Sequence, residues 1–86
     1  MSRWRKKQVV VEAWQFMPAA QREKPPPWID PRWFHEDGAT DAPHMLIPTH
    51  GGPLRADLTD WIIRGVKGEV YPCKADVFAA SYEPMR

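Results

Sequence analysis

The most constraining feature of this 86-residue sequence is a strand–turn–strand–helix pattern between residues 58 and 84. Its first part, residues 59–66, is the best strand in the chain. Alternation along that strand places Trp61 and Ile63 on one face and Ile62 on the other. We therefore expect residues 58–84 to form the folded centre of the domain.

The second half of the pattern returns the chain along the first strand. Lys67-Gly68 form the turn into a strand over residues 69–73, where Pro72 marks a sheet edge or the end of the strand. Residues 74–82 are predicted to form a helix of about two turns. Two aromatic residues at i, i+4 spacing define its apolar side, Phe78 and Tyr82.

The rest of the chain adds further β-structure. Residues 8–16 are predicted to form a strand, and the successive valines at 9–11 indicate burial on both faces, as in a central strand or a barrel. Residues 44–50 and 54–57 are predicted to form a hairpin, because the Gly51-Gly52-Pro53 segment between them suits a tight turn.

The connection from 17 to 43 is rich in proline and tryptophan. Prolines are tolerated in a first helical turn, so a short helix is predicted over residues 27–36. An irregular aromatic loop folded over the sheet is the alternative. Trp28, Trp33 and Phe34 then either cover the core or form an exposed patch for a partner.

These elements predict a single α+β domain spanning residues 1–86. The expected architecture is a small twisted antiparallel sheet or an open β-barrel of about five strands, with one or two short helices. A chain of this length buries only about 60–65 % of its unfolded surface, so its core is small. Five tryptophans offset that, since each can bury on the order of 150–250 Å².

Composition narrows the class of protein. Cys73 is the single cysteine, so a disulfide within the chain is excluded, and a reducing compartment fits best. The basic start is followed by no signal-peptide core, and no apolar run is long enough to span a membrane. We expect a soluble cytoplasmic protein with no membrane contact.

Residue types that carry catalysis occur without a recognisable arrangement. Three histidines and Cys73 match no compact zinc-ligand spacing, and Asp57 and Asp60 are explained by capping of their own turn. Cys73 precedes a helix, where a thiol can have a lowered pKa, but we interpret it as a small half-buried side chain. We therefore predict a non-enzymatic protein without a cofactor or metal. The three histidines considered as zinc ligands are His35, His44 and His50.

The candidate binding residues lie mostly outside residues 58–84. The N-terminal segment combines cations with an aromatic ring, as phosphate contact plus base stacking requires, although a solvated terminus accounts for it too. Net charge is only +1, so the whole molecule exerts no general attraction on nucleic acid. The candidate partner-binding residues are Arg3, Trp4, Arg5, Lys6, Lys7, Trp28, Trp33, Arg64 and Lys67.

Residues 60–74, read as DWIIRGVKGEVYPCK, resemble the C-terminal signature of a family of small uncharacterised bacteriophage and prophage proteins. The resemblance continues through Asp76, Phe78 and residues 82–84, and residues 5–13 are similar to the family's N-terminal part. The family carries Pro-Gly where this chain has Leu58-Thr59, and proline where it has Ala75. Both departures concern turn and cap chemistry.

The resemblance implies a phage or prophage origin without fixing an activity. Small phage proteins that lack catalytic groups act by covering a surface of a host machine, so we expect an inhibitor of a host defence system, of the anti-CRISPR type. Its partner would be a host protein or a ribonucleoprotein complex. Two alternatives stay open: direct binding of nucleic acid through the basic N-terminus, and a nucleotide-binding sponge.

Overall fold

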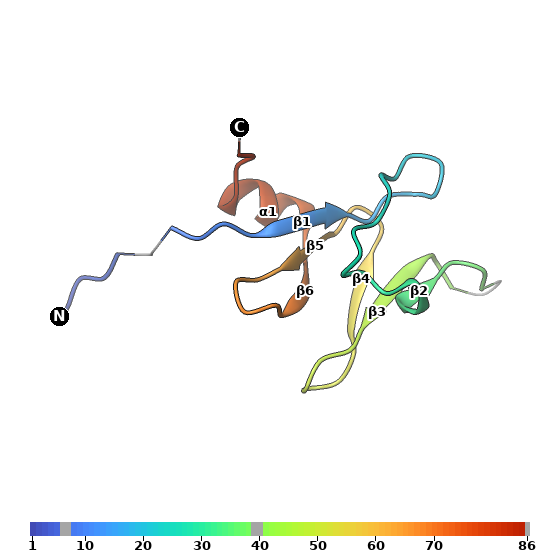
Figure 1. Cartoon of the computed structure of the whole chain (residues 1–86), viewed down its shortest axis with the longest axis horizontal. Coiled ribbons are helices and arrows are strands. Elements are labelled where there is room, and N and C mark those ends of the chain that lie inside the picture. Colours follow the sequence, from blue (N-terminus) through green and yellow to red (C-terminus); the bar gives the residue numbers. More distant parts are fainter. Residues whose placement is uncertain (6–7, 39–40, 86) are drawn as a thin grey trace.

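The computed structural model describes residues 1–5, 8–38 and 41–85, and these fold into two small sheets and one helix (Figure 1). Each sheet has three antiparallel strands, in the orders β1-β5-β6 and β2-β3-β4. The elements in chain order are β1 (Glu12–Gln15), the 3-10 turn η1 (Pro31–Trp33), β2 (Phe34–His35), β3 (His44–Ile47), β4 (Leu54–Asp57), β5 (Trp61–Arg64), β6 (Val70–Cys73) and α1 (Ala75–Ser81).

The division into two sheets corrects the prediction of one sheet or an open barrel of about five strands, whereas the mixture of strands with a short helix agrees with it. The chain passes from one sheet to the other between β4 and β5, through a turn at residues 57–60. There the Asp60 N–H donates to the Asp57 carbonyl at 3.0 Å, and Thr59 has a φ of 79°. The two strands that flank this tight turn belong to different sheets, since β4 pairs with β3 and β5 pairs with β1 and β6.

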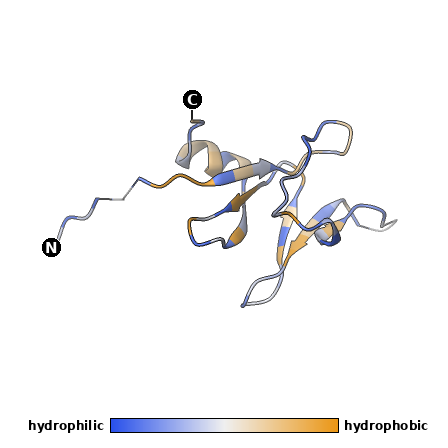
Figure 2. Ribbon diagram, viewed as in Figure 1, coloured by the Kyte–Doolittle hydropathy of each residue, from blue (hydrophilic) through white to orange (hydrophobic). Residues whose placement is uncertain are grey.

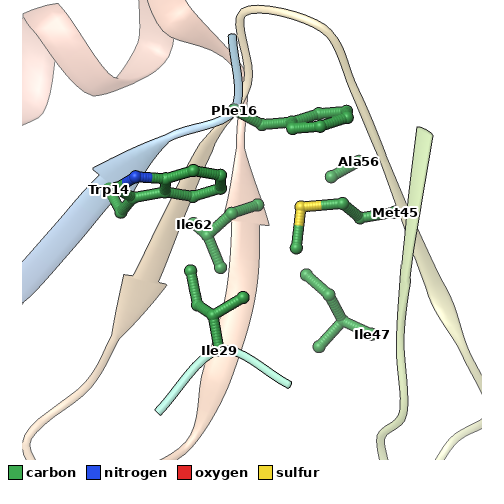
Figure 3. Close-up of a cluster of buried hydrophobic side chains, with 7 residues drawn as sticks. All are labelled: Trp14, Phe16, Ile29, Met45, Ile47, Ala56 and Ile62. Carbon is green, nitrogen blue, oxygen red and sulfur yellow. The ribbon is translucent and has the colours of Figure 1, made fainter. Parts of the chain in front are cut away.

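The main core lies between the two sheets (Figure 3). One side comes from the inner face of the first sheet, where Trp14 on β1 lies opposite Ile62 on β5. The other side comes from β3 and β4, where Met45 lies opposite Ala56. The buried members of this core are Trp14, Phe16, Ile29, Met45, Ile47, Ala56 and Ile62.

The predicted helix over residues 27–36 is wrong, and the irregular alternative describes this segment. Pro31 restricts the residue before it, and Asp30 is extended, with φ −79° and ψ 126°. The Asp30 carboxylate then accepts the Arg32 N–H at 2.8 Å, which caps a single 3-10 turn. Three aromatic residues of this segment pack half-buried against the core, Trp28, Trp33 and Phe34.

Arg22 holds the segment after β1 against the core. Its guanidinium lies over the rings of Phe16 and Phe34, at 5.2 and 5.1 Å from their centroids. It also pairs with the Glu36 carboxylate and donates to the Met17 carbonyl at 3.0 Å. One side chain therefore ties together segments on both sides of the proline-rich stretch.

The N-terminal strand is shorter and more exposed than predicted. β1 begins at Glu12, and Val9 and Val10 are 50 % and 67 % exposed. Figure 2 shows this apolar stretch just before β1. The prediction of a central strand buried on both faces is therefore wrong, because β1 pairs only with β5 among the described residues.

The C-terminal unit agrees most closely with its prediction. β5 and β6 form a hairpin in which Ile62 lies opposite Pro72, and β6 is an edge strand of its sheet. α1 follows directly and covers the outer face of that sheet. Within the described part of the chain, every helix is too short or too polar to cross a membrane.

Candidate functional site

An apolar groove of about 650 Å³ lies on the outer face of the β1-β5-β6 sheet. One wall is formed by Val9–Val11 and Ala13, and the other by the side of α1 that carries Phe78 and Ala79. The chain after the helix, residues 82–85, completes the lining. We call this feature the β1–α1 groove.

The groove exists because α1 covers only part of the sheet. On β5, Ile62 faces the main core, so Trp61 and Ile63 face the opposite side. The helix packs on this opposite side, and Ile63 is fully buried there. The outer face of β1 is left with Val11 and Ala13 half-buried beside the helix.

Three stacked aromatic rings form the helix wall of the groove. The ring of Phe78 lies 4.2 Å from that of Trp61 with an interplanar angle of 9°, and 5.0 Å from the ring of Tyr82 with an angle of 26°. Phe78 and Tyr82 stand one helical turn apart, which aligns them on one side of α1. The wall is therefore flat and apolar.

A charged cluster fixes where the helix starts. Asp60 is 3 % exposed, and its carboxylate accepts the Asp57 N–H at 2.9 Å and the Lys74 ammonium at 3.0 Å. Lys74 also reaches the Asp57 carboxylate at 3.4 Å. Because Lys74 immediately precedes α1, this cluster ties the helix to the turn at residues 57–60.

The titratable groups beside this cluster keep their protons at neutral pH. The hydrogen bond with Asp60 raises the pKa of Lys74, so this ammonium stays charged. Burial, together with the nearby Asp60 and Asp76, raises the pKa of the Cys73 thiol. Since the thiolate is the nucleophilic form, Cys73 is poorly suited to covalent chemistry.

Burial also raises the pKa of Tyr71 to about 12, with the neighbouring Tyr82 hydroxyl as the next largest cause. Both tyrosines belong to the outer side of the first sheet, on β6 and after α1. A phenol that holds its proton this strongly is a donor, not a base, at physiological pH.

The predicted N-terminal residues precede the groove. Arg3, Trp4 and Arg5 are exposed, and Trp4 keeps 92 % of its surface. Lys6 and Lys7 lie outside the described residues. In the sequence, this segment comes shortly before the valines at 9–11 that line the groove.

Two of the other predicted site residues meet at one carboxylate. Glu12 accepts a hydrogen bond from the Trp28 indole N–H at 3.0 Å, and its other oxygen lies 3.6 Å from the Arg64 guanidinium. Lys67 is exposed in the adjoining β5–β6 turn. Trp28 and Trp33 both pack against the main core, and of the two Trp28 also bonds Glu12. The structure thus joins Trp28 to Arg64 and leaves Trp33 apart from them.

The histidines take part in local contacts. His35 and His44 stack across β2 and β3, with ring centroids 5.2 Å apart, and the His44 Nδ1 lies 2.8 Å from the Ala42 carbonyl. Within residues 1–5, 8–38 and 41–85, no three side chains of His, Cys, Asp or Glu are placed to hold a metal ion.

Sequence reasoning missed most of the groove. The sequence places the valines at 9–11 in a buried strand, and Phe78 and Tyr82 on the apolar side of a helix. A usable signal was present, because Val9–Val11 form an apolar run beside a basic segment. No family model, curated protein or solved structure matches this chain.

Proposed function

We propose that this chain is a small non-enzymatic phage or prophage protein that inhibits a host defence system, of the anti-CRISPR type, by covering a surface of a host protein. The observation that carries the proposal is the apolar β1–α1 groove. The resemblance of residues 60–74 to small phage proteins supplies the biological setting.

The groove has the properties of a protein-recognition site. Its volume of about 650 Å³ lies within the usual range for binding pockets. Its stacked aromatic wall offers a large contact area at little cost in side-chain entropy, as interface hot spots do. Glu83 is a charged residue among the apolar lining and can orient a cationic group of the partner.

The chemistry around the groove favours occupation over catalysis. Cys73 and Lys74 both hold their protons at neutral pH, since burial raises the first pKa and the Asp60 carboxylate raises the second. A host segment with two or three apolar side chains would fit the groove. The rest of the domain would then cover the surface of the host protein around that segment. Inhibition by steric occlusion requires nothing further.

A host-infection assay tests the function. The chain is expressed in a bacterial host whose CRISPR system targets the infecting phage, and plaques are counted. We expect wild type to restore plaques, Ala79→Arg to abolish the effect by placing a long cation in the groove, and Val77→Arg to retain it. Val77 is the matched control because it is 52 % exposed on the same helix and does not line the groove.

A photo-crosslinking amino acid identifies the partner directly. Placed at position 79 it should form an adduct with one host protein during infection, and placed at position 77 it should not. Equal adducts at both positions, or plaque counts unaffected by wild type across the host's defence systems, would contradict the proposal.

Direct nucleic-acid binding is the second candidate, favoured by the full exposure of Trp4 between Arg3 and Arg5. An exposed aromatic ring flanked by cations suits stacking on single-stranded bases. With the four cations of residues 3–7 engaged, log affinity should fall with log salt with a slope of about −3. Deleting residues 1–7 should abolish that binding, and a salt-independent affinity would exclude it.

A further inference from the structure

The outer edge of β1 is open and unusually unprotected. β1 is an edge strand of its sheet, and the chain before it runs on in the direction of the strand (Figure 1). Edge strands are normally protected by proline, lysine, glycine bulges or inward charges. Residues 9–15 contain no proline, glycine or lysine, and Glu12 is their one charged residue.

Even that charge is engaged within the molecule. The Glu12 carboxylate binds the Trp28 indole N–H at 3.0 Å and lies 3.6 Å from Arg64. It is therefore directed toward the inner face and does not guard the edge. The other edge of the same sheet is protected, because β6 carries Pro72 and packs near β4.

The direction of the backbone groups follows from the pairing of β1 with β5. The Phe16 N–H donates to the Asp60 carbonyl at 2.9 Å. Bonding alternates along an antiparallel ladder, so Trp14 and Glu12 also bond toward β5. The N–H and C=O groups of Ala13 and Gln15 then point outward, and those of Val9 and Val11 continue the row.

We propose that this edge pairs with the same edge of a second copy, forming a two-fold symmetric dimer with a continuous six-stranded sheet. The segment complementary to an open, apolar, β-branched edge is one with the same properties, and β1 with its preceding valines is such a segment. Identical edges pair antiparallel about a two-fold axis, and the pairing closes because each copy uses its β1 edge once, leaving outside only the β6 edges that carry Pro72.

Charge selects the register. Centring the pair on Glu12 would place two carboxylates directly opposite each other, which is destabilising in a sheet. Centring it on Val11 separates them and places Val9 opposite the partner's Ala13. The outward-facing groups of both copies then meet, and Val11 lies on the two-fold axis. Residues 8–14 form the paired segment.

The dimer changes the surface that the molecule presents. Opposed residues of an antiparallel pair point to the same face, so the two α1 helices lie on one side of the joined sheet. The two β1–α1 grooves then meet across the axis as one longer apolar channel. This inference goes beyond the proposed function and fails independently of it, because its readout is the mass of the purified chain.

The association is expected to be weak. Two paired seven-residue segments bury less than the roughly 1,200 Å² of a standard interface, so the dimer should depend on concentration. Light scattering over a dilution series up to about 1 mM should show a shift toward twice the monomer mass of 10.0 kDa. A constant monomer mass across that range would overturn the inference.

Two proline substitutions, made one at a time, locate the interface. Val9→Pro removes an outward N–H that the dimer uses, so it should weaken association at least tenfold. Val10→Pro is the matched control, since its N–H points to the β5 side, beyond the end of that strand, and dimerisation should be kept. Equal dimerisation of both variants would place the contact elsewhere and refute the pairing.

Two cysteine substitutions, made one at a time, test the register of the paired strands without requiring the dimer to be stable. In a Cys73→Ser background, Val11→Cys should form an intermolecular disulfide under mild oxidation at least tenfold faster than Val77→Cys. Facing strands bring such residues within the Cα separation of about 4.4–6.8 Å that a disulfide needs. Equal rates at the two positions would contradict a two-fold axis at Val11.

Discussion

The ring of Phe78 in α1 stacks on the ring of Trp61 in β5, with centroids 4.2 Å apart and planes 9° from parallel. No residue of α1 is fully buried, and a helix of seven residues is too short to be stable alone. The stack is therefore the main attachment of the helix to the sheet. It also forms the wall of the β1–α1 groove.

Replacing Phe78 with alanine should release the helix. The change removes the contacts with Trp61 and Tyr82, and a half-buried ring of this kind is expected to cost about 2 kcal/mol of unfolding free energy. Urea denaturation followed by tryptophan fluorescence measures it. Val77→Ala, on the same helix, should change stability by less than about 0.5 kcal/mol. Equal effects would show that the stack does not hold α1.

Thr59 is expected to be strained, and glycine should relieve it. Its φ of 79° is the left-handed region that a β-branched residue adopts at a cost of about 1–2 kcal/mol. Thr59→Gly should therefore stabilise the fold by about 1 kcal/mol, raising Tm by about 4–8 °C. Thr59→Ala keeps a Cβ and should gain much less. A fall in Tm for the glycine variant would argue against strain at this turn.

Asp60 should be far more important to stability than its neighbour Asp57. Its buried carboxylate bonds the Asp57 N–H and the Lys74 ammonium, so Asp60→Ala leaves a buried donor without a partner. A loss of about 3 kcal/mol is expected. Asp57→Ala removes only exposed ion pairs and should cost about 1 kcal/mol or less. Similar losses in the two variants, measured by urea unfolding, would contradict this ranking.

Lowering the pH should reduce the stability of the fold by protonating the carboxylates that pair with Arg55. Its guanidinium bonds the carboxylates of Asp57 at 2.8 Å and Asp41 at 3.1 Å, and holds the pKa of both below the ordinary 3.8. Between those lowered values and 3.8 the unfolded chain binds more protons than the folded one. The stability from these pairs is therefore complete above the ordinary pKa and is lost as pH falls through the folded values.

Urea midpoints measured from about pH 5 to about pH 2 check this dependence. Wild type should lose stability more steeply than Arg55→Gln, because the variant removes the group that lowers both pKa values. Arg32→Gln is a useful comparison, since it separates the Asp30 pair from the Arg55 cluster. Identical slopes for wild type and Arg55→Gln would show that these ion pairs do not contribute.

The turn at residues 57–60 shows how a sequence pattern gains meaning from the fold. From the sequence alone, the resemblance to small phage proteins implies that Pro-Gly is the expected pair where this chain has Leu58-Thr59. Those positions are i+1 and i+2 of the turn, where proline supplies the first φ and glycine tolerates the positive second one. The sequence predicted altered turn chemistry at these two positions. The backbone shows that Thr59, with a φ of 79°, is the strained residue.

The candidate site was less predictable than the elements around it. Trp28 and Trp33 looked alike in the sequence and both pack against the core, yet Trp28 also donates its indole N–H to the Glu12 carboxylate. The β1–α1 groove joins segments more than fifty residues apart, and its shape depends on how far α1 extends over the sheet. Neither relationship follows from local spacing.

Local pattern by itself determined the hairpin of β5 and β6, the helix after it, the faces of Trp61 and Ile62, and the glycine-containing hairpin of β3 and β4. Alternation and helical spacing act over a few residues, so a sequence displays them directly. Only the tertiary structure decided that the strands divide into two sheets and that the valines before β1 are exposed. Sheet membership depends on which distant strands meet, and the chain crosses between the sheets twice, from β1 to β2 and from β4 to β5, so no local spacing reveals it.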